Sequence, residues 1–288
     1  MKQRQKILQD QTWDDSLFDQ GFVVIPFLEP GEIDTLKDFY WTCHPTKQEG
    51  FFSSAHMPDP IFRDRVNKGV KAVFERANNE TLADCRTLGG SFIAKGPGES
   101  GHLQPHQDWN IVDESKYRSF NIWVPLVDVG RLNGAVSVIS GSHEWTKSFR
   151  GANIKDAWNN TYPILWKHMQ LLEMKAGEAL VYDHRLLHGS QPNYSEEMRM
   201  VAVYGIMPEA ADMYYYYAEN EHIAEYKCDP EFYINANPFD GPGTLEKHRD
   251  LPYHFPEFNH RDVASFLGIE LPKPATATFW ERLVRIFR

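Results

Sequence analysis

The stretch Gln104-Pro105-His106-Gln107-Asp108-Trp109 decides how the rest of this chain is interpreted. Pro105 excludes a regular helix here, because a proline inside a helix removes a backbone hydrogen bond and collides with the preceding turn. In an extended segment, side chains two residues apart point to the same side, so the imidazole of His106 and the carboxylate of Asp108 face one point. We therefore predict that these two groups hold one metal ion together.

A third ligand is available further along the chain, in Leu187-His188-Gly189-Ser190. His188 follows the apolar run 179–182 and stands at the start of a polar turn. Two histidines and one carboxylate on one face of an ion leave its other positions open, which is typical of non-haem Fe(II) oxygenases. His184 is the competing histidine, and we interpret it as a surface or supporting residue.

The short motif alone is a weak signal, since the chain contains 12 histidines and chance pairs are common. Arg199 adds context, because it is polar within the otherwise apolar strand predicted over 198–204. An unpaired guanidinium is costly to bury, so it must meet an anion or face solvent. Two interpretations remain open: a clamp for a carboxylate, or a solvent-facing arginine on the outer side of the strand.

Composition narrows the class of protein. The 288 residues are 42% hydrophobic, and no apolar run is long enough to span a bilayer. The beginning of the chain is polar and lacks the apolar core of a signal peptide, so we expect a cytoplasmic protein. Its formal charge of −10 argues against nucleic acid as a partner. Three separated cysteines, Cys43, Cys85 and Cys228, indicate neither disulfides nor a zinc site.

The pattern of secondary structure changes near residue 82. Before it, helical periodicity predicts helices that open near residue 30 and at residue 61. After it come short apolar or alternating runs separated by glycine, proline and asparagine, which are typical of a β-sandwich or barrel. We therefore predict a mainly β fold with flanking helices. The predicted strands cover residues 91–95, 104–109, 119–126, 135–139, 179–182 and 198–204.

Several motifs, in this order, resemble the phytanoyl-CoA dioxygenase family of Fe(II)/2-oxoglutarate-dependent oxygenases over about residues 17–207. The resemblance is extended, and the combination is far more specific than any single motif. The matching segments are 18–25 with 29–33, 95–98 leading to 106–109, 121–126, 133–135 through 141–143, and 176–178 through 188–190, followed by Asn193 and Arg199.

The resemblance implies a double-stranded β-helix, a cupin-like jelly roll with the metal in its mouth. It also implies Fe(II), 2-oxoglutarate as cosubstrate and O2, with release of succinate and CO2. The residues that match the family's site are His106, Asp108 and His188 as iron ligands, Arg199 as the partner of the distal carboxylate of 2-oxoglutarate, and Ser190 and Trp123 in the cosubstrate pocket.

The reaction implied is hydroxylation of a C–H bond of a small organic or acyl substrate. Asp108 fills the position that related halogenases leave vacant for chloride, so hydroxylation is favoured over halogenation, while desaturation and ring formation stay open.

Two other classes of function also stay open. A zinc-dependent hydrolase uses similar ligands, but no further acid stands near them as a general base. An inactive jelly-roll binding protein would not need all three ligands and Arg199.

We expect one domain over residues 1–274, followed by an amphipathic helix at 275–288. We favour packing of this helix on its own domain, while contact with a partner or a membrane surface stays open. Residues 144–173 would cover the site, and residues 228–262 would be loop. The expected parts of the domain are a helical part at 1–80, a jelly-roll core at 85–210 and a loop-rich part at 211–274. The candidate cavity residues are Phe51, Phe52, Trp109, Tyr117, Trp145 and Tyr214 to Tyr217.

Overall fold

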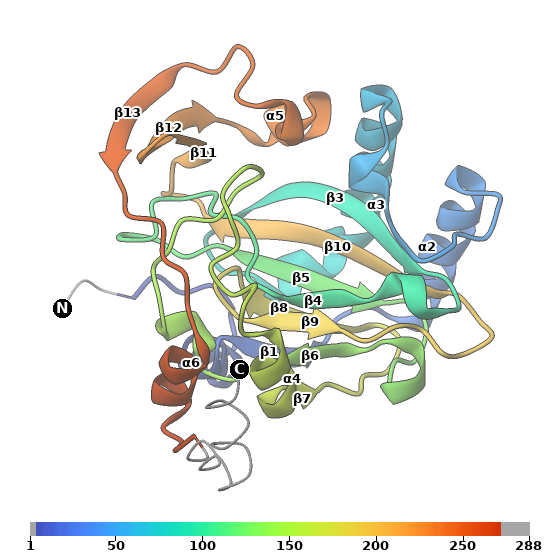
Figure 1. Cartoon of the computed structure of the whole chain (residues 1–288). Helices are drawn as coiled ribbons and strands as arrows, with labels where there is room; N and C mark the ends of the chain where they lie inside the picture. Colours follow the sequence, from blue (N-terminus) through green and yellow to red (C-terminus); the bar gives the residue numbers. More distant parts are fainter. Residues whose placement is uncertain (1–3, 272–288) are drawn as a thin grey trace, which may run out of the picture.

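Two antiparallel sheets face each other in the computed structural model, which describes residues 4–271 (Figure 1). The main sheet has six strands in the order β1-β8-β5-β10-β3-β2, and the smaller sheet has the order β4-β9-β6-β7. The arrangement is a jelly roll, so the predicted fold class is confirmed. The main-sheet strands are β1 (Phe22–Pro26), β2 (Phe51–Ser53), β3 (Cys85–Lys95), β5 (Phe120–Pro125), β8 (Glu178–Asp183) and β10 (Arg199–Pro208). The smaller sheet contains β4 (Leu103–His106), β6 (Val136–Val138), β7 (Gln170–Leu171) and β9 (His188–Ser190).

Three helices cover the outer face of the main sheet: α1 (Gln11–Gln20), α2 (Pro30–Cys43) and α3 (Pro60–Thr81). The start of α3 follows from its sequence, because Asp59 accepts a hydrogen bond from the Ile61 amide and Pro60 tolerates the first helical position. The apolar stripes of α2 and α3 pack with the outer face of the main sheet in one large core. The predicted helices are therefore present at nearly the predicted positions.

Alternation along the strands decides which side chains face the interior of the jelly roll. In β10, Met200, Ala202 and Tyr204 pack toward the helices, while Val201 and Val203 pack between the two sheets. Because side chains alternate in a strand, Arg199 lies on the inner side with Val201. The outer, solvent-facing interpretation of this arginine is therefore wrong.

A third sheet follows the jelly roll, formed by β11 (Met213–Glu219), β12 (His222–Cys228) and β13 (Lys247–Pro252). It stands beyond one end of the main sheet, together with α5 (Pro230–Asn235), as Figure 1 shows. The prediction of loop over 228–262 is therefore wrong. The apolar alternation that reveals a strand is missing from β13, because most of its side chains are exposed and the strand is held by pairing with β12.

The remaining elements are two helices and short 3₁₀ turns. Residues 144–173 contain α4 (Tyr162–His168), and α6 (His260–Leu267) packs in the same core as the buried Trp158. The 3₁₀ turns are η1 (Ser54–His56), η2 (Glu99–Gly101), η3 (Arg131–Asn133), η4 (Ser142–Glu144) and η5 (Pro238–Asp240).

The jelly roll begins earlier than the expected residue 85, because β1 and β2 join the main sheet from the N-terminal part. The amphipathic segment predicted at 275–288 lies outside the described residues. Within residues 4–271, no helix is long and apolar enough to cross a membrane.

Candidate functional site

Two neighbouring strands bring His106 and His188 together. In the pairing of β4 with β9, His106 lies directly opposite His188, and their ring centroids are 4.3 Å apart. Asp108 follows in the segment after β4, and its Oδ1 lies 3.9 Å from Nε2 of each histidine. One ligand atom from each of the three residues lies within 4.8 Å of the others. The structure thus forms the predicted trio of metal-ligating side chains.

The backbone orients both imidazoles. Nδ1 of His106 donates to the carbonyl oxygen of Gln104 at 2.7 Å, and Nδ1 of His188 donates to that of Leu186 at 3.0 Å. These bonds fix the tautomer with the proton on Nδ1, so each Nε2 lone pair is free and turned toward Asp108. The rings are therefore presented to a cation in the correct protonation state.

The carboxylate of Asp108 is also oriented and charged. Asn121, on the inner face of β5, donates to Asp108 Oδ2 at 2.7 Å and to the hydroxyl of Tyr182 at 3.3 Å. Burial raises the pKa of Asp108, but the imidazoles of His188, His184 and His106 outweigh this effect and hold the pKa at about 2. Burial and the neighbouring His106 lower the pKa of His188 to about 4. At neutral pH the trio therefore contains a carboxylate and at least one neutral imidazole, as metal binding requires.

Two buried basic side chains lie opposite each other on neighbouring strands. In the pairing of β3 with β10, Lys95 is the direct partner of Arg199, and their side chains are 0% and 2% exposed, respectively. A charge on Lys95 would repel Arg199 directly opposite it, and burial together with this guanidinium lowers the pKa of Lys95 to about 6. Within residues 4–271, neither side chain forms an ion pair with a carboxylate, and Nε of Arg199 has no hydrogen-bond partner. An incoming anion would relieve this repulsion.

Polar and aromatic groups hold the two cations in place. Lys95 Nζ donates to Ser190 Oγ at 2.6 Å and to the carbonyl oxygen of Gln191 at 2.7 Å. The guanidinium of Arg199 donates to the carbonyl oxygen of Gly134 and lies 5.3 Å from the ring centre of Trp123. Ser190 shares a strand face with His188 two residues away, so the cations lie within about 10 Å of the trio.

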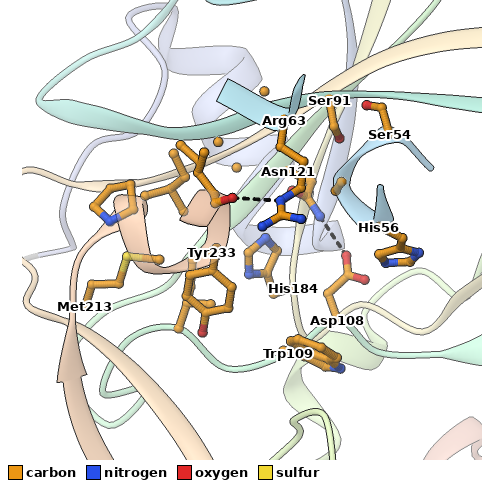
Figure 2. Close-up of a pocket in the computed structure, with 18 residues that line it drawn as sticks. Ser54, His56, Arg63, Ser91, Asp108, Trp109, Asn121, His184, Met213 and Tyr233 are labelled. Carbon is orange, nitrogen blue, oxygen red and sulfur yellow. Dashed lines mark hydrogen bonds between the residues drawn. The ribbon is translucent and has the colours of Figure 1, made fainter. Parts of the chain in front are cut away.

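A cavity of about 320 Å³ opens on the other side of Asp108. Figure 2 shows Arg63 and His184 projecting into its middle, between Asp108 and Tyr233. A smaller cavity of about 180 Å³ borders His106, and Trp109 lines both spaces. Space for a small molecule is therefore available next to the metal-ligating trio.

A sequence profile described as Phytanoyl-CoA dioxygenase (PhyH) matches residues 32–201, which include the trio and Arg199. The chain belongs to the phytanoyl-CoA dioxygenase family. Phytanoyl-CoA dioxygenase 1 of Oryza sativa subsp. japonica is 27% identical over 152 residues, covering 50% of this chain and 52% of the relative. Phytanoyl-CoA dioxygenase of Arabidopsis thaliana is 32% identical over 111 residues, covering 38% of this chain and 39% of the relative. The aligned part is thus about half or less of these relatives.

Solved structures share the fold of this family member. The carbocyclase SnoK from nogalamycin biosynthesis, a non-haem α-ketoglutarate-dependent enzyme, superimposes with a TM-score of 0.53 at 18% identity, covering 71% of this chain and 86% of SnoK. The epimerase SnoN, solved with Fe³⁺, α-ketoglutarate and nogalamycin RO, gives a TM-score of 0.52 at 18% identity, covering 85% of this chain and 95% of SnoN. At this identity the likeness establishes the jelly roll.

The residues predicted from the sequence divide into those that the site brings together and those that it does not. The three ligands meet, Ser190 accepts a hydrogen bond from Lys95, and Trp123 lies against Arg199, the strand partner of Lys95. Among the candidate cavity residues, Trp109 alone lines the cavity beside Asp108. The others pack elsewhere: Phe51 and Phe52 in β2, Tyr117 beside Val112, Trp145 against Phe266, and Tyr214 to Tyr217 in β11.

The sequence interpretation missed several polar residues of the site. His184 was interpreted as a surface or supporting residue, but it is 5% exposed and lines the cavity. Gln107 packs inward, where it accepts a hydrogen bond from the indole of Trp158 at 3.0 Å. Lys95, Asn121 and Arg63 were not singled out. Of these three residues, only Lys95 has a signal in the sequence. It ends an alternating apolar strand, and a lysine buried there needs a partner.

Proposed function

We propose that this protein is an Fe(II)- and 2-oxoglutarate-dependent dioxygenase that hydroxylates a C–H bond of a small organic or acyl substrate. The observation that carries the proposal is the pair of buried basic side chains, Arg199 and Lys95, which have no carboxylate partner within residues 4–271 and lie beside the metal-ligating trio. A bare metal site has no need for such a pair. A dianionic cosubstrate, which binds iron at one end and has a free carboxylate at the other, uses both features.

The donor set fits iron. His106, Asp108 and His188 would supply two imidazole nitrogens and one carboxylate oxygen from one side of the ion, the arrangement typical of non-haem Fe(II) oxygenases. When bound, iron with 2-oxoglutarate and O2 supplies the oxidising power, with succinate and CO2 as coproducts and one oxygen atom transferred to the substrate.

The chain's own groups orient the participants. Asn121 holds the carboxylate of Asp108, since its amide donates to the oxygen that is turned away from the histidines. Arg199 and Lys95 would pair with the distal carboxylate of 2-oxoglutarate, and the hydroxyl of Ser190 would donate to it. Trp123 covers the guanidinium and limits access of water to this end.

The test is succinate production from 2-oxoglutarate in air, measured with purified protein and Fe(II), with a panel of small organic acids, alcohols and acyl compounds. We expect succinate from the wild type and none above background from His106→Ala. Arg199→Met is expected to need far more 2-oxoglutarate for the same rate, since the iron ligands stay intact. Equal succinate levels in wild type and His106→Ala would refute the proposal.

The same samples separate the two alternatives. A zinc-dependent hydrolase would hydrolyse esters or amides of the panel after loading with Zn(II), and it would leave 2-oxoglutarate unchanged in air. An inactive binding protein would bind iron and 2-oxoglutarate in calorimetry without forming succinate. A gain of one oxygen atom in a panel compound, seen by mass spectrometry, is the result that we expect.

A further inference from the structure

We propose that the substrate is a compact carboxylic acid whose carboxylate is bound by Arg63 in the cavity beside Asp108. This inference rests on the oxygenase function proposed above and names the class of molecule that enters the same site. It is carried by the surroundings of Arg63, by the apolar walls of the cavity and by its size.

Arg63 is a charged group buried without an anion. Its side chain extends from the first turns of α3 into the cavity wall, where the residue is 7% exposed. Each hydrogen bond that it makes within residues 4–271 goes to a main-chain carbonyl oxygen. The acceptors are Ile234 at 2.7 Å, Met57, Pro58 at 3.1 Å and Ala236 at 3.3 Å. Carbonyl dipoles offset part of the charge but do not neutralise it.

The guanidinium keeps one donor for a ligand. An arginine has five N–H groups, and Arg63 uses one at Nε, two at Nη1 and one at Nη2. One N–H of Nη2 is thus left for an acceptor in the cavity. No carboxylate among the described residues lies close enough to this side chain to form an ion pair. A carboxylate on the ligand would supply both the acceptor and the missing negative charge.

The cavity around Arg63 is apolar along part of its wall. Its walls include Leu88, Ile111, Met213 and Tyr233, which suit a hydrocarbon or aromatic body. Its volume of about 320 Å³ lies at the lower end of the roughly 300–1,000 Å³ common for ligand pockets. A coenzyme A thioester fits this space poorly, because its nucleotide would remain outside and its neutral thioester would leave Arg63 unpaired.

His184 provides a second polar point in the same cavity. Its Nδ1 lies 2.9 Å from Ser119 Oγ, while its buried Nε2 has no hydrogen-bond partner among the described residues. A buried polar atom without a partner costs free energy, so a ligand that offers one is favoured. The substrate is therefore an acid with an apolar body and one further polar group, such as a hydroxyl or keto oxygen.

The test compares acids with their neutral amides. The probes are 3-phenylpropionate with 3-phenylpropanamide, and octanoate with octanamide, titrated into protein loaded with Ni(II) and saturated with 2-oxoglutarate. We expect each acid to bind about 10- to 100-fold more tightly than its amide, the range for a charge-assisted hydrogen bond. Equal affinities, no binding of either acid, or competition of the acid with 2-oxoglutarate would overturn the inference.

Two variants locate the binding. Arg63→Gln is expected to remove the preference for the acid while leaving the amide's affinity within about threefold, a change in ratio that a purely structural arginine would not cause. Because this substitution also breaks bonds to α5, Gly89→Val is the second variant. A Cβ at Gly89 would lie 3.6 Å from Ile234, an ordinary contact, so a side chain can start there, and the two further methyl groups of valine would occupy cavity space. It should weaken acid binding at least tenfold and leave 2-oxoglutarate binding unchanged.

The outcomes separate the two proposals. Failure of Ni(II) and 2-oxoglutarate to bind would refute the oxygenase function and the substrate inference with it. Normal binding of both, without preference for acids in the wild type, would refute the substrate inference alone. Unchanged acid binding in Gly89→Val would place the acid outside this cavity and would refute it as well.

Discussion

Replacing Lys95 with methionine is expected to abolish a proton uptake that accompanies binding of 2-oxoglutarate. Burial, with the neighbouring Arg199 guanidinium, lowers the pKa of Lys95 to about 6. At pH 7.5 an amine with this pKa is charged in only about 3% of molecules. A carboxylate placed against Lys95 and Arg199 favours the ammonium form and raises this pKa again.

The size and sign of the effect follow from these values. If bound carboxylate restores the pKa of Lys95 to its ordinary value of about 10, binding at pH 7.5 takes up nearly one proton. Since the pKa rises on binding, affinity strengthens as pH falls from about 10 to about 6, by up to about tenfold per unit. In Lys95→Met this dependence should be lost, and affinity at pH 7.5 should fall.

Calorimetry measures the proton uptake directly. Protein loaded with Ni(II) is titrated with 2-oxoglutarate at pH 7.5 in phosphate and in Tris, and the difference in apparent enthalpy gives the number of protons. His102 is the neighbouring titratable group, and burial and Lys95 lower its pKa. His102→Gln is therefore the matched control and should keep the uptake. A wild-type value near zero, or an equal value in Lys95→Met, would refute the reasoning.

Three further variants test the buried groups. Arg199→Met should weaken 2-oxoglutarate binding about 30-fold or more, as expected when ~2 kcal/mol or more is lost with a buried charge pair. It should also raise the melting temperature of the metal-free protein, because it removes a buried charge without an anion; a lower melting temperature would contradict this. Asn121→Ala should weaken Fe(II) binding about 10- to 100-fold in competition with a chelator, because Asp108 loses its orienting amide. Trp158→Ala should destabilise the protein by about 3–5 kcal/mol in urea unfolding, since this ring is 1% exposed and stacks on Phe258.

The metal-ligating trio was predictable because one pair in it is local and the third residue matches the resembled family's pattern. His106 and Asp108 are two residues apart in an extended segment, and His188 follows an apolar strand. For Arg199, the sequence predicts its place in a strand but not the face of the strand on which it lies. The sequence establishes that it interrupts an apolar strand, but which face of β10 points inward depends on how that strand packs against α2 and α3.

The second cation was not predictable from local pattern. Lys95 acquires its role through the register of β3 against β10, which places it opposite Arg199. Strands so far apart in sequence carry no local signal of their register. The burial of His184 has a similar origin, because it lies in the turn between β8 and β9 and is covered by Ser119 from a third segment. β13 escaped detection because an exposed edge strand needs no apolar alternation.

The buried basic groups lie on opposite sides of the metal-ligating trio inside the jelly roll. β3 turns Gly89 and Ser91 toward the cavity that contains Arg63, and the same strand face ends at Lys95 beside Arg199. Residues 89 and 95 are six positions apart, which is about 20 Å along a strand. The trio lies between these ends, since Asp108 borders the cavity and His188 shares a strand face with Ser190. In a chain with a net charge of −10, buried basic groups on both sides of the metal, Arg63 on one side and Arg199 with Lys95 on the other, favour two anions, one on each side. The cosubstrate carboxylate would then bind at Lys95 and Arg199, and the substrate acid at Arg63, so that neither displaces the other.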